Sequence, residues 1–447
     1  MPASIGRISA LLLLAFVLLA GALGYTAATG PSLTARVDNP RHILAERRIL
    51  RGRISDRFGE TIVETIGTPG SYARRVRYPD AAPVAGYYSI NYGRSGIEQA
   101  FDATLRGQLD LDPAQAHLNA LLHRSPAGRG VQLTLDLSVQ RMADALLRGQ
   151  SGAVVVLSVA GGEVIAMSSQ PTFDPNTLDE NWDTLRADPA APLLNRATQG
   201  QYQPGTAFQP VLLSEVLRRE AGSLDETPEF PTTPFRIDSR ALACREEAGV
   251  VTLADAFRAA CPGPFADLGA VLGGAALQEL VATWGLTETS VVELGAARSL
   301  TQPLALTDTQ SLRELAAGQG SLTVTPLHMA LVASTLAARG EMRPARIVSA
   351  TQAIDGAWQP APRPEARRVL PASVADQVVA AMPRDGDSVW HAGEGLSGAL
   401  RLLWFIGMAP VDRPRYAVAV LVEVAADAPQ PERFAIEIGQ TLLKSLP

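Results

Sequence analysis

Apolar positions along the chain predict one long apolar helix, followed by strands, then helices, then strands again. The first apolar stretch, from Ile8 to Ala28, contains no charged residue and is about 21 residues long, enough to span a bilayer. Because Arg7 precedes it, we expect a single anchor with the rest of the chain outside the cytoplasm. A cleaved signal peptide is the alternative, since the densest apolar run, 11–20, is short and small residues follow it.

The rest of the chain shows two kinds of periodicity. Alternation predicts a strand at 61–66, after an Asp-Arg-Phe-Gly turn, and apolar runs separated by turn residues predict two hairpins. The hairpin strands are 152–159 with 163–167, and 404–409 with 415–423. Helical patterns are expected at 138–147, through most of 207–340, and at 434–446. Strands, helices and strands in this order predict an α+β fold, since no βαβ alternation is present.

Composition limits the chemistry. The 447 residues are sufficient for two or three domains, and the net charge of -6 provides no basic face for nucleic acid. No metal or organic cofactor signature is present, so we expect neither. Lysine occurs once, as Lys444, and the other 38 of the 39 basic residues are arginine. A mechanism that needs a lysine amine therefore has one candidate.

Two cysteines, Cys244 and Cys261, lie 17 residues apart. In an oxidising compartment they could form a disulfide that stabilises the fold by roughly 3 kcal/mol. The spacing excludes a C-x-x-C site, and two separate buried thiols are an equal alternative.

Several strings, in order over nearly the whole chain, resemble the class B penicillin-binding proteins, the membrane-anchored transpeptidases that cross-link peptidoglycan. The strings are Arg-Gly-Arg-Ile-Ser-Asp-Arg-Phe-Gly-Glu at 51–60, Ser-Gly-Ile-Glu at 95–98, Gly-Gln-Gly at 318–320, Thr-Pro-Leu at 325–327 and Trp-Phe-Ile-Gly-Met-Ala-Pro at 404–410. The resemblance implies a penicillin-binding transpeptidase fold, with an antiparallel sheet flanked by helices. It also implies an anchor at 1–30, a β-rich pedestal (dimerisation-like) domain at 31–148 and a transpeptidase-like domain at 149–447.

The three catalytic motifs of that family are degenerate here. Where S-x-x-K is expected, after Tyr-Gln-Pro-Gly, the chain has Thr206 and Gln209. Where S-x-N is expected, it has Ala260 and Pro262. Counting back from Trp404 places K-T-G-T at Glu394, Gly395, Leu396 and Ser397. The nucleophilic serine and both lysines are therefore replaced, and no serine has a lysine three residues later.

These replacements predict a large loss of activity. Thr206 keeps a hydroxyl, but a Gln209 amide cannot accept its proton, and losing a base and an electrostatic donor costs on the order of 10⁵ in rate, about 7 kcal/mol. A carboxylate at Glu394 should also repel the anionic terminus of a stem peptide. We interpret His391 as a solvated residue beside a turn. Lys444 fits the end of a C-terminal helix, where its charge complements the helix dipole.

We therefore expect a membrane-anchored pseudoenzyme that acts in cell-wall synthesis through protein or substrate binding. By resemblance, its partners are a polytopic glycosyltransferase or other elongation and division membrane proteins, and the stem peptide of peptidoglycan. The arginine-rich stretch at 47–57 is either a partner-binding element or a solvated strand face. The alternatives are a slow transpeptidase or carboxypeptidase using Thr206, and a module that binds peptidoglycan fragments or β-lactams without acylation.

Overall fold

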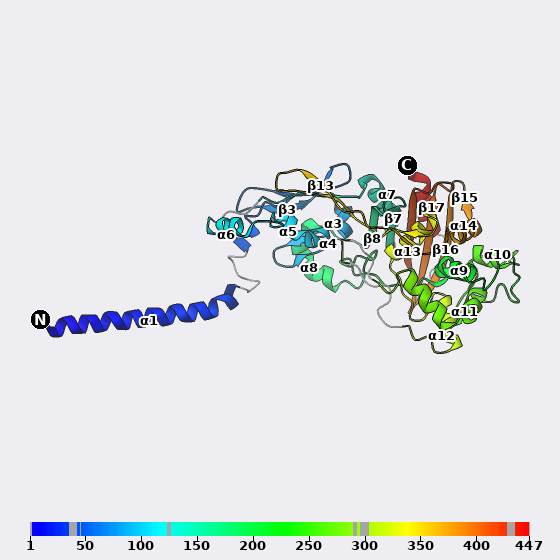
Figure 1. The fold of residues 1–447 in the computed structure, drawn as a ribbon, viewed down its shortest axis with the longest axis horizontal. Helices are drawn as coiled ribbons and strands as arrows, with labels where there is room; N and C mark the ends of the chain where they lie inside the picture. Colours follow the sequence, from blue (N-terminus) through cyan, green and yellow to red (C-terminus); the bar gives the residue numbers. More distant parts are fainter. Residues whose placement is uncertain are drawn as a thin grey trace.

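The computed structural model describes residues 2–34, 43–44, 46–122, 127–288, 293–295, 304–426 and 434–446. Figure 1 shows an elongated head with helix α1 (Pro2–Thr34) extending from one end. The span 6–27 of α1 has a mean hydropathy of 2.4 and no buried part. A second helix, α11 (Pro262–Thr283), is also long and apolar, but 39% of its apolar window is buried in the protein. We therefore interpret α11 as a core helix and α1 as the one candidate span among the described residues.

The end of the head nearest α1 contains a six-stranded sheet in the order β13-β12-β6-β1-β2-β3. Its strands are β1 (Ile54–Ser55), β2 (Thr61–Ile66), β3 (Ala73–Val76), β6 (Val131–Leu133), β12 (Val348–Gln352) and β13 (Trp358–Pro360). The predicted strand at 61–66 and the turn before it are confirmed. However, β12 and β13 come from the range that the sequence assigned to the transpeptidase-like domain, so the predicted boundary at 148 is incomplete. Strand β12, which pairs with β6 in the pedestal sheet, follows β6 in the sequence by about 200 residues.

Smaller elements surround this sheet in the pedestal. They are η1 (Pro79–Ala81), α3 (Ala82–Ala85), β4 (Tyr88–Ser89), β5 (Gly93–Arg94), α4 (Gly96–Ala100), α5 (Asp102–Leu105) and α6 (Pro113–Leu121).

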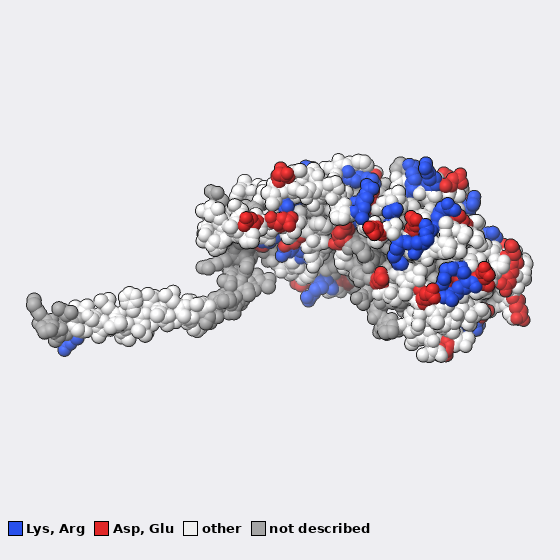
Figure 2. Space-filling view, in the orientation of Figure 1, with Lys and Arg blue, Asp and Glu red and all other residues white. Residues whose placement is uncertain are grey.

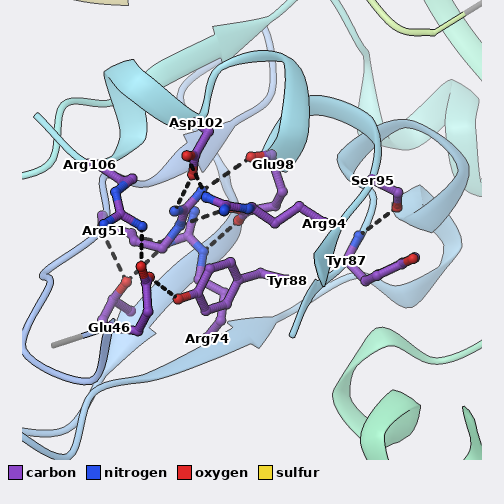
Figure 3. Close-up of polar contacts among 11 residues, drawn as sticks. Glu46, Arg51, Arg74, Tyr87, Tyr88, Arg94, Ser95, Glu98, Asp102 and Arg106 are labelled. Atoms are coloured by element: carbon purple, nitrogen blue, oxygen red, sulfur yellow. Dashed lines mark hydrogen bonds and ion pairs between the residues drawn. The ribbon is translucent and has the colours of Figure 1, made fainter. Parts of the chain in front are cut away.

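A buried ion network lies inside the pedestal (Figure 3). Arg51 binds Glu98 through both Nε (3.0 Å) and Nη2 (2.6 Å), and Asp102 through Nη1 (2.6 Å). Arg74 binds the second oxygen of Glu98, and Arg94 pairs with Asp102. The arginines at 51 and 74 are thus internal counterions, which corrects the interpretation of Arg51 as a solvated or partner-binding residue. Removing one member would leave its partner's charge buried, a strongly destabilising change.

The second part of the head is built on an antiparallel sheet in the order β15-β16-β17-β18-β7-β8. Its strands are β7 (Ser151–Ser158), β8 (Val164–Gln170), β15 (Arg384–Asp385), β16 (Ser388–Ser397), β17 (Leu400–Ala409) and β18 (Tyr416–Ala425). Both predicted hairpins are therefore confirmed, as β7–β8 and β17–β18. Their strands are almost continuously apolar because helices cover both faces of the sheet.

Those helices form two layers. On one face, α13 (Pro326–Ala337) packs on β7, β17 and β18, and its side chains join those of Val155 and Leu421 in one core. On the other face, α7 (Leu137–Leu147) and α15 (Phe434–Ser445) cover Val154 and Val420. The helices expected at 138–147 and 434–446 are thus confirmed, and so is the α+β arrangement. Strand alternation sends neighbouring residues into different cores.

The remaining elements surround these layers. They are η2 (Pro175–Thr177), α8 (Leu178–Ala187), η3 (Gly205–Phe208), α9 (Gln209–Arg218), β9 (Phe235–Ile237), β10 (Arg240–Leu242), α10 (Leu253–Arg258), α12 (Thr309–Ala316), β11 (Glu341–Met342), β14 (Arg367–Arg368) and α14 (Ala372–Ala381).

A buried polar cluster joins α7 to β8 and η1. The Gln140 amide pairs with both backbone groups of Met167 (2.8 and 3.0 Å) and donates to the Asp80 carbonyl (3.2 Å). Asp144, which is 1% exposed, accepts from Gln140 (3.0 Å) and from the Ser168 hydroxyl. Burial raises the pKa of Asp144 to about 7, against the lowering effect of these two hydrogen bonds.

Asp144→Asn should make stability less dependent on pH. A carboxyl with a raised folded pKa binds more protons in the native state, so its contribution to stability is full below pH 4 and is lost as the pH rises through about 7. We expect the variant to melt above the wild type at pH 8, and the difference to shrink as the pH falls towards 4. Thermal unfolding over this range measures it, with the exposed Asp183→Asn as the control. Equal pH slopes for Asp144→Asn and wild type would contradict the assignment.

Candidate functional site

A cavity of about 380 Å³ lies beside strand β16. It is lined by the start of the η3–α9 segment, by the stretch that follows β10, by the turn before α11, and by β16 and β17. The lining residues that carry the argument are Thr206, Arg245, Ala260, Gly393, Glu394 and Arg401. The structure therefore brings together residues from all three degenerate motifs, which lie far apart in the sequence.

Thr206 lies in the short 3-10 turn η3 and is 2% exposed. Its hydroxyl oxygen accepts a hydrogen bond from the backbone N–H of Glu394 (3.0 Å). The Thr206 carbonyl is hydrogen-bonded to His391 Nε2 (3.1 Å). Two hydrogen bonds from β16 therefore hold both the side chain and the backbone of Thr206.

Two glycines allow this close approach. A Cβ at Gly393 would lie 2.6 Å from the Thr206 hydroxyl oxygen and would overlap the backbone of Ala207. At Gly205 the backbone φ is +54°, a left-handed conformation, and a Cβ would overlap the Glu394 carbonyl. The backbones of η3 and β16 are therefore in direct contact, so any side chain at either glycine would separate them.

Gln209, the first residue of α9, follows Thr206 by three positions and is 1% exposed. Its Nε2 donates to the Cys261 carbonyl (2.8 Å), and its Oε1 has no hydrogen-bond partner among the described residues. The amide thus ties the turn of the first motif to that of the second. An amide in this position positions backbone but accepts no proton at neutral pH.

The second motif position is a tight turn between α10 and α11. Ala260 has a backbone φ of +55°, and Pro262 is the first residue of α11, where a missing N–H costs nothing. Neither side chain offers a hydrogen-bonding group to the cavity.

Cys244 and Cys261 are joined by a disulfide, with their Cα atoms 4.0 Å apart. The bond fixes the stretch after β10 to the turn that carries Ala260, so it holds one wall of the cavity. Arg245, the next residue, places its guanidinium over the Trp390 ring (5.0 Å to the centroid) and donates to the Ala392 carbonyl (3.3 Å).

His391 is not the solvated residue that the sequence suggested. It lies within β16, is fully buried, and stacks on Phe257 of α10 with ring centroids 4.6 Å apart. Burial lowers the pKa of His391 to about 3, with the nearby Arg245 charge acting in the same direction. The imidazole is therefore neutral at physiological pH and supplies no positive charge beside Thr206.

Glu394 also differs from its expected role. Arg401, two residues from the position opposite Glu394 on β17, forms a bidentate ion pair with it, both N–O distances being 2.6 Å. The carboxylate is therefore compensated, and the strong repulsion of an anionic ligand expected from the sequence is wrong. A sequence motif does not predict a counterion on a neighbouring strand, because which side chains meet depends on the strand register.

The other three positions assigned to the third motif lie further along β16. Gly395 packs against the Gln203 carbonyl, Leu396 lines the cavity, and Ser397 ends the strand opposite Leu400. The segment in contact with Thr206 is instead His391–Glu394, which begins three residues earlier. A shift of three on a strand also changes the face, so His391 and Glu394 point to opposite sides of the sheet.

Lys444 lies in α15 and pairs with Asp385 (2.7 Å). It does not line the cavity at Thr206. Sequence reasoning did not single out Arg245 and Arg401, which no motif contains. In the part of the chain that the structure describes, no group of three metal-ligating side chains was found.

Comparisons with known proteins agree with this geometry. Residues 152–444 match the family model of the penicillin binding protein transpeptidase domain, and residues 51–131 match that of the penicillin binding protein A dimerisation domain. The peptidoglycan D,D-transpeptidase PbpA of Mycolicibacterium smegmatis is 31% identical over 96% of this chain and 95% of its own, and that of Mycobacterium tuberculosis is 29% identical over the same shares.

Solved structures agree as well. The crystal structure of PBPA from M. tuberculosis superposes with a TM-score of 0.78 at 26% identity, covering 88% of this chain and 98% of that chain. A penicillin G acyl-enzyme complex of penicillin-binding protein A from the same organism gives 0.77 at 27% identity, covering 89% and 99%. The architecture and these matches lead to one conclusion: the chain is a class B member of the penicillin-binding protein transpeptidase family.

Proposed function

We propose that this chain is a pseudoenzyme of its family, anchored in the cell membrane with its head outside the cytoplasm. It takes part in peptidoglycan synthesis by binding a protein or a substrate and does not form an acyl-enzyme. The observation that carries this proposal is the surroundings of Thr206, where neither Gln209 nor His391 nor the single lysine supplies a base for the hydroxyl proton.

Three candidates for that proton acceptor fail for different reasons. The Gln209 amide is not basic, and its nitrogen is held by the Cys261 carbonyl. His391 has a pKa of about 3, so it is a weak base, and its Nε2 is bound to the backbone of Thr206 itself. Lys444 is paired with Asp385 away from the cavity. None of these three side chains therefore supplies a base for the Thr206 hydroxyl.

The second and third motifs support the same conclusion. Ala260 and Pro262 remove both a hydroxyl that could relay a proton and an amide that could hold substrate backbone. We assign the third motif to His391, Ala392 and Gly393, because this segment contacts Thr206 and its glycine makes the close approach. In this register the lysine position is occupied by a neutral, buried imidazole.

The remaining contacts favour a binding role. Thr206 and Glu394 line the cavity, and Arg245 provides a cation on its wall. Such a site can hold a peptide or a β-lactam without acylation. By resemblance to its family, the head and α1 together would engage a polytopic glycosyltransferase or other elongation or division proteins of the membrane.

The direct test is incubation of the protein with a fluorescent penicillin, followed by a denaturing gel and intact mass measurement. We expect no covalent adduct, because the handicap is on the order of 10⁵ in rate. Thr206→Ala should behave as the wild type does. An adduct that forms on the wild type and disappears in Thr206→Ala would show instead a slow acyl-transfer enzyme that uses Thr206.

A second test concerns the register of the third motif. Two matched variants carry Thr206→Ser, Gln209→Lys, Ala260→Ser and Pro262→Asn, and differ only in the added lysine: His391→Lys in one and Glu394→Lys in the other.

We expect penicillin labelling only in the variant with His391→Lys, because this side chain lies on the face that contacts η3 and α10. The Glu394→Lys variant should stay unlabelled, since that side chain lies on the opposite face beside Arg401. Labelling of the Glu394→Lys variant alone would contradict our register. Circular dichroism establishes that both variants fold.

A further inference from the structure

The ion network of the pedestal also fixes where the chain enters it. Glu46 accepts hydrogen bonds from Arg106, at the end of α5, and from the Tyr88 hydroxyl (2.6 Å) (Figure 3). Burial raises the pKa of Glu46, but these two hydrogen bonds outweigh it and leave the pKa below its usual value. The carboxylate therefore stays charged. Glu46 is only 12 residues beyond Thr34, the last residue of α1. The entry point is therefore held against α5.

Helix α6 begins seven residues after Arg106, and its last turn, together with the residue that follows it, carries an exposed apolar stripe. Leu118, Leu121 and Leu122 have spacings of three and four, which place them on one helical face. They are 47%, 64% and 48% exposed, respectively. Gln115 and Asn119, linked by a hydrogen bond (3.1 Å), flank the stripe. Apolar side chains on one face beside polar side chains make the end of this helix amphipathic.

The neighbouring surface extends the stripe. Leu44, Leu50 and Leu109 are also exposed and lie beside the chain entry. The Leu50 and Leu109 carbonyls are held by Gly128 and Arg129, so this surface is ordered. Figure 2 shows an uncharged tip at the end of the head around α6, with acidic patches beside it. The exposed Arg47 and Arg48 lie between two of these leucines, where they could meet lipid phosphates.

Covalent reach keeps this surface close to the bilayer. From Thr34 to Glu46 the chain can extend at most about 43 Å, at 3.6 Å per residue. Figure 1 shows α6 at the end of the head from which α1 extends. The bilayer that α1 spans is therefore always close to α6, whereas a protein partner or a second copy has to arrive by diffusion.

We propose that α6 is a membrane-contacting helix that inserts the stripe Leu118, Leu121 and Leu122 into the outer interface of the bilayer spanned by α1. This contact adds a second membrane attachment to the one that α1 provides and sets the orientation of the head. The inference depends on α1 being a retained anchor, and it is independent of whether the cavity at Thr206 is catalytically active.

The test uses the full chain in vesicles of phosphatidylethanolamine and phosphatidylglycerol without other proteins. Leu121→Cys supplies a single free thiol for an environment-sensitive fluorophore, since Cys244 and Cys261 are disulfide-bonded. The matched control is Val271→Cys in α11, a site of similar exposure (69%) in the second part of the head. Resistance to carbonate extraction first shows that α1 is integrated, and its failure would refute the anchor separately.

With lipids spin-labelled near the headgroup, we expect the probe at 121 to lose fluorescence. The probe at 271 should keep its fluorescence. Adding Leu118→Gln and Leu122→Gln should restore the fluorescence at 121 without changing the melting temperature, because both side chains are exposed. Unquenched fluorescence at 121 would overturn the proposal. Quenching that persists after the two glutamine substitutions would also overturn it. So would a probe at 121 that is buried in native membranes but not in the vesicles, which would indicate a protein partner.

Discussion

The site depends on direct backbone contact between η3 and strand β16. Gly205 and Gly393 leave no Cβ between the two segments, and the Glu394 N–H donates to the Thr206 hydroxyl. This contact requires two glycines, backbone groups and one hydroxyl, so it does not depend on the other side chains that line the cavity. The cavity, the disulfide wall and the Gln209 bridge are all arranged around it. The geometry of the site can therefore be kept whichever side chains occupy the remaining motif positions.

The sequence was sufficient for most of the fold. Both hairpins, α7 and α15 follow from periodicity and turn residues, because local pattern and tertiary burial agree there. That Thr206 and Ala260 lie close together followed from resemblance of the flanking strings. Counting residues is less certain on β16, because the flanking string lies across a hairpin and leaves the register free by several positions.

Electrostatic properties were the least predictable. His391 was expected in solvent and is buried against Phe257, while the Glu394 charge is cancelled by Arg401 on the next strand. Arg51, in a run of basic residues, turned out to be an internal counterion for Glu98 and Asp102. Each error has one cause: the partner lies outside the motif, and only strand pairing or domain packing brings it into contact.

The pairing of β12 with β6 has a consequence for how the chain matures. Residues 131–133 obtain one of their two neighbouring strands from residues 348–352, so the pedestal sheet has an open edge until the last quarter of the chain has emerged. Synthesis from the N-terminus therefore yields α1 first and a complete pedestal late. The two parts of the head become stable together, and a stop anywhere between them would leave an exposed strand.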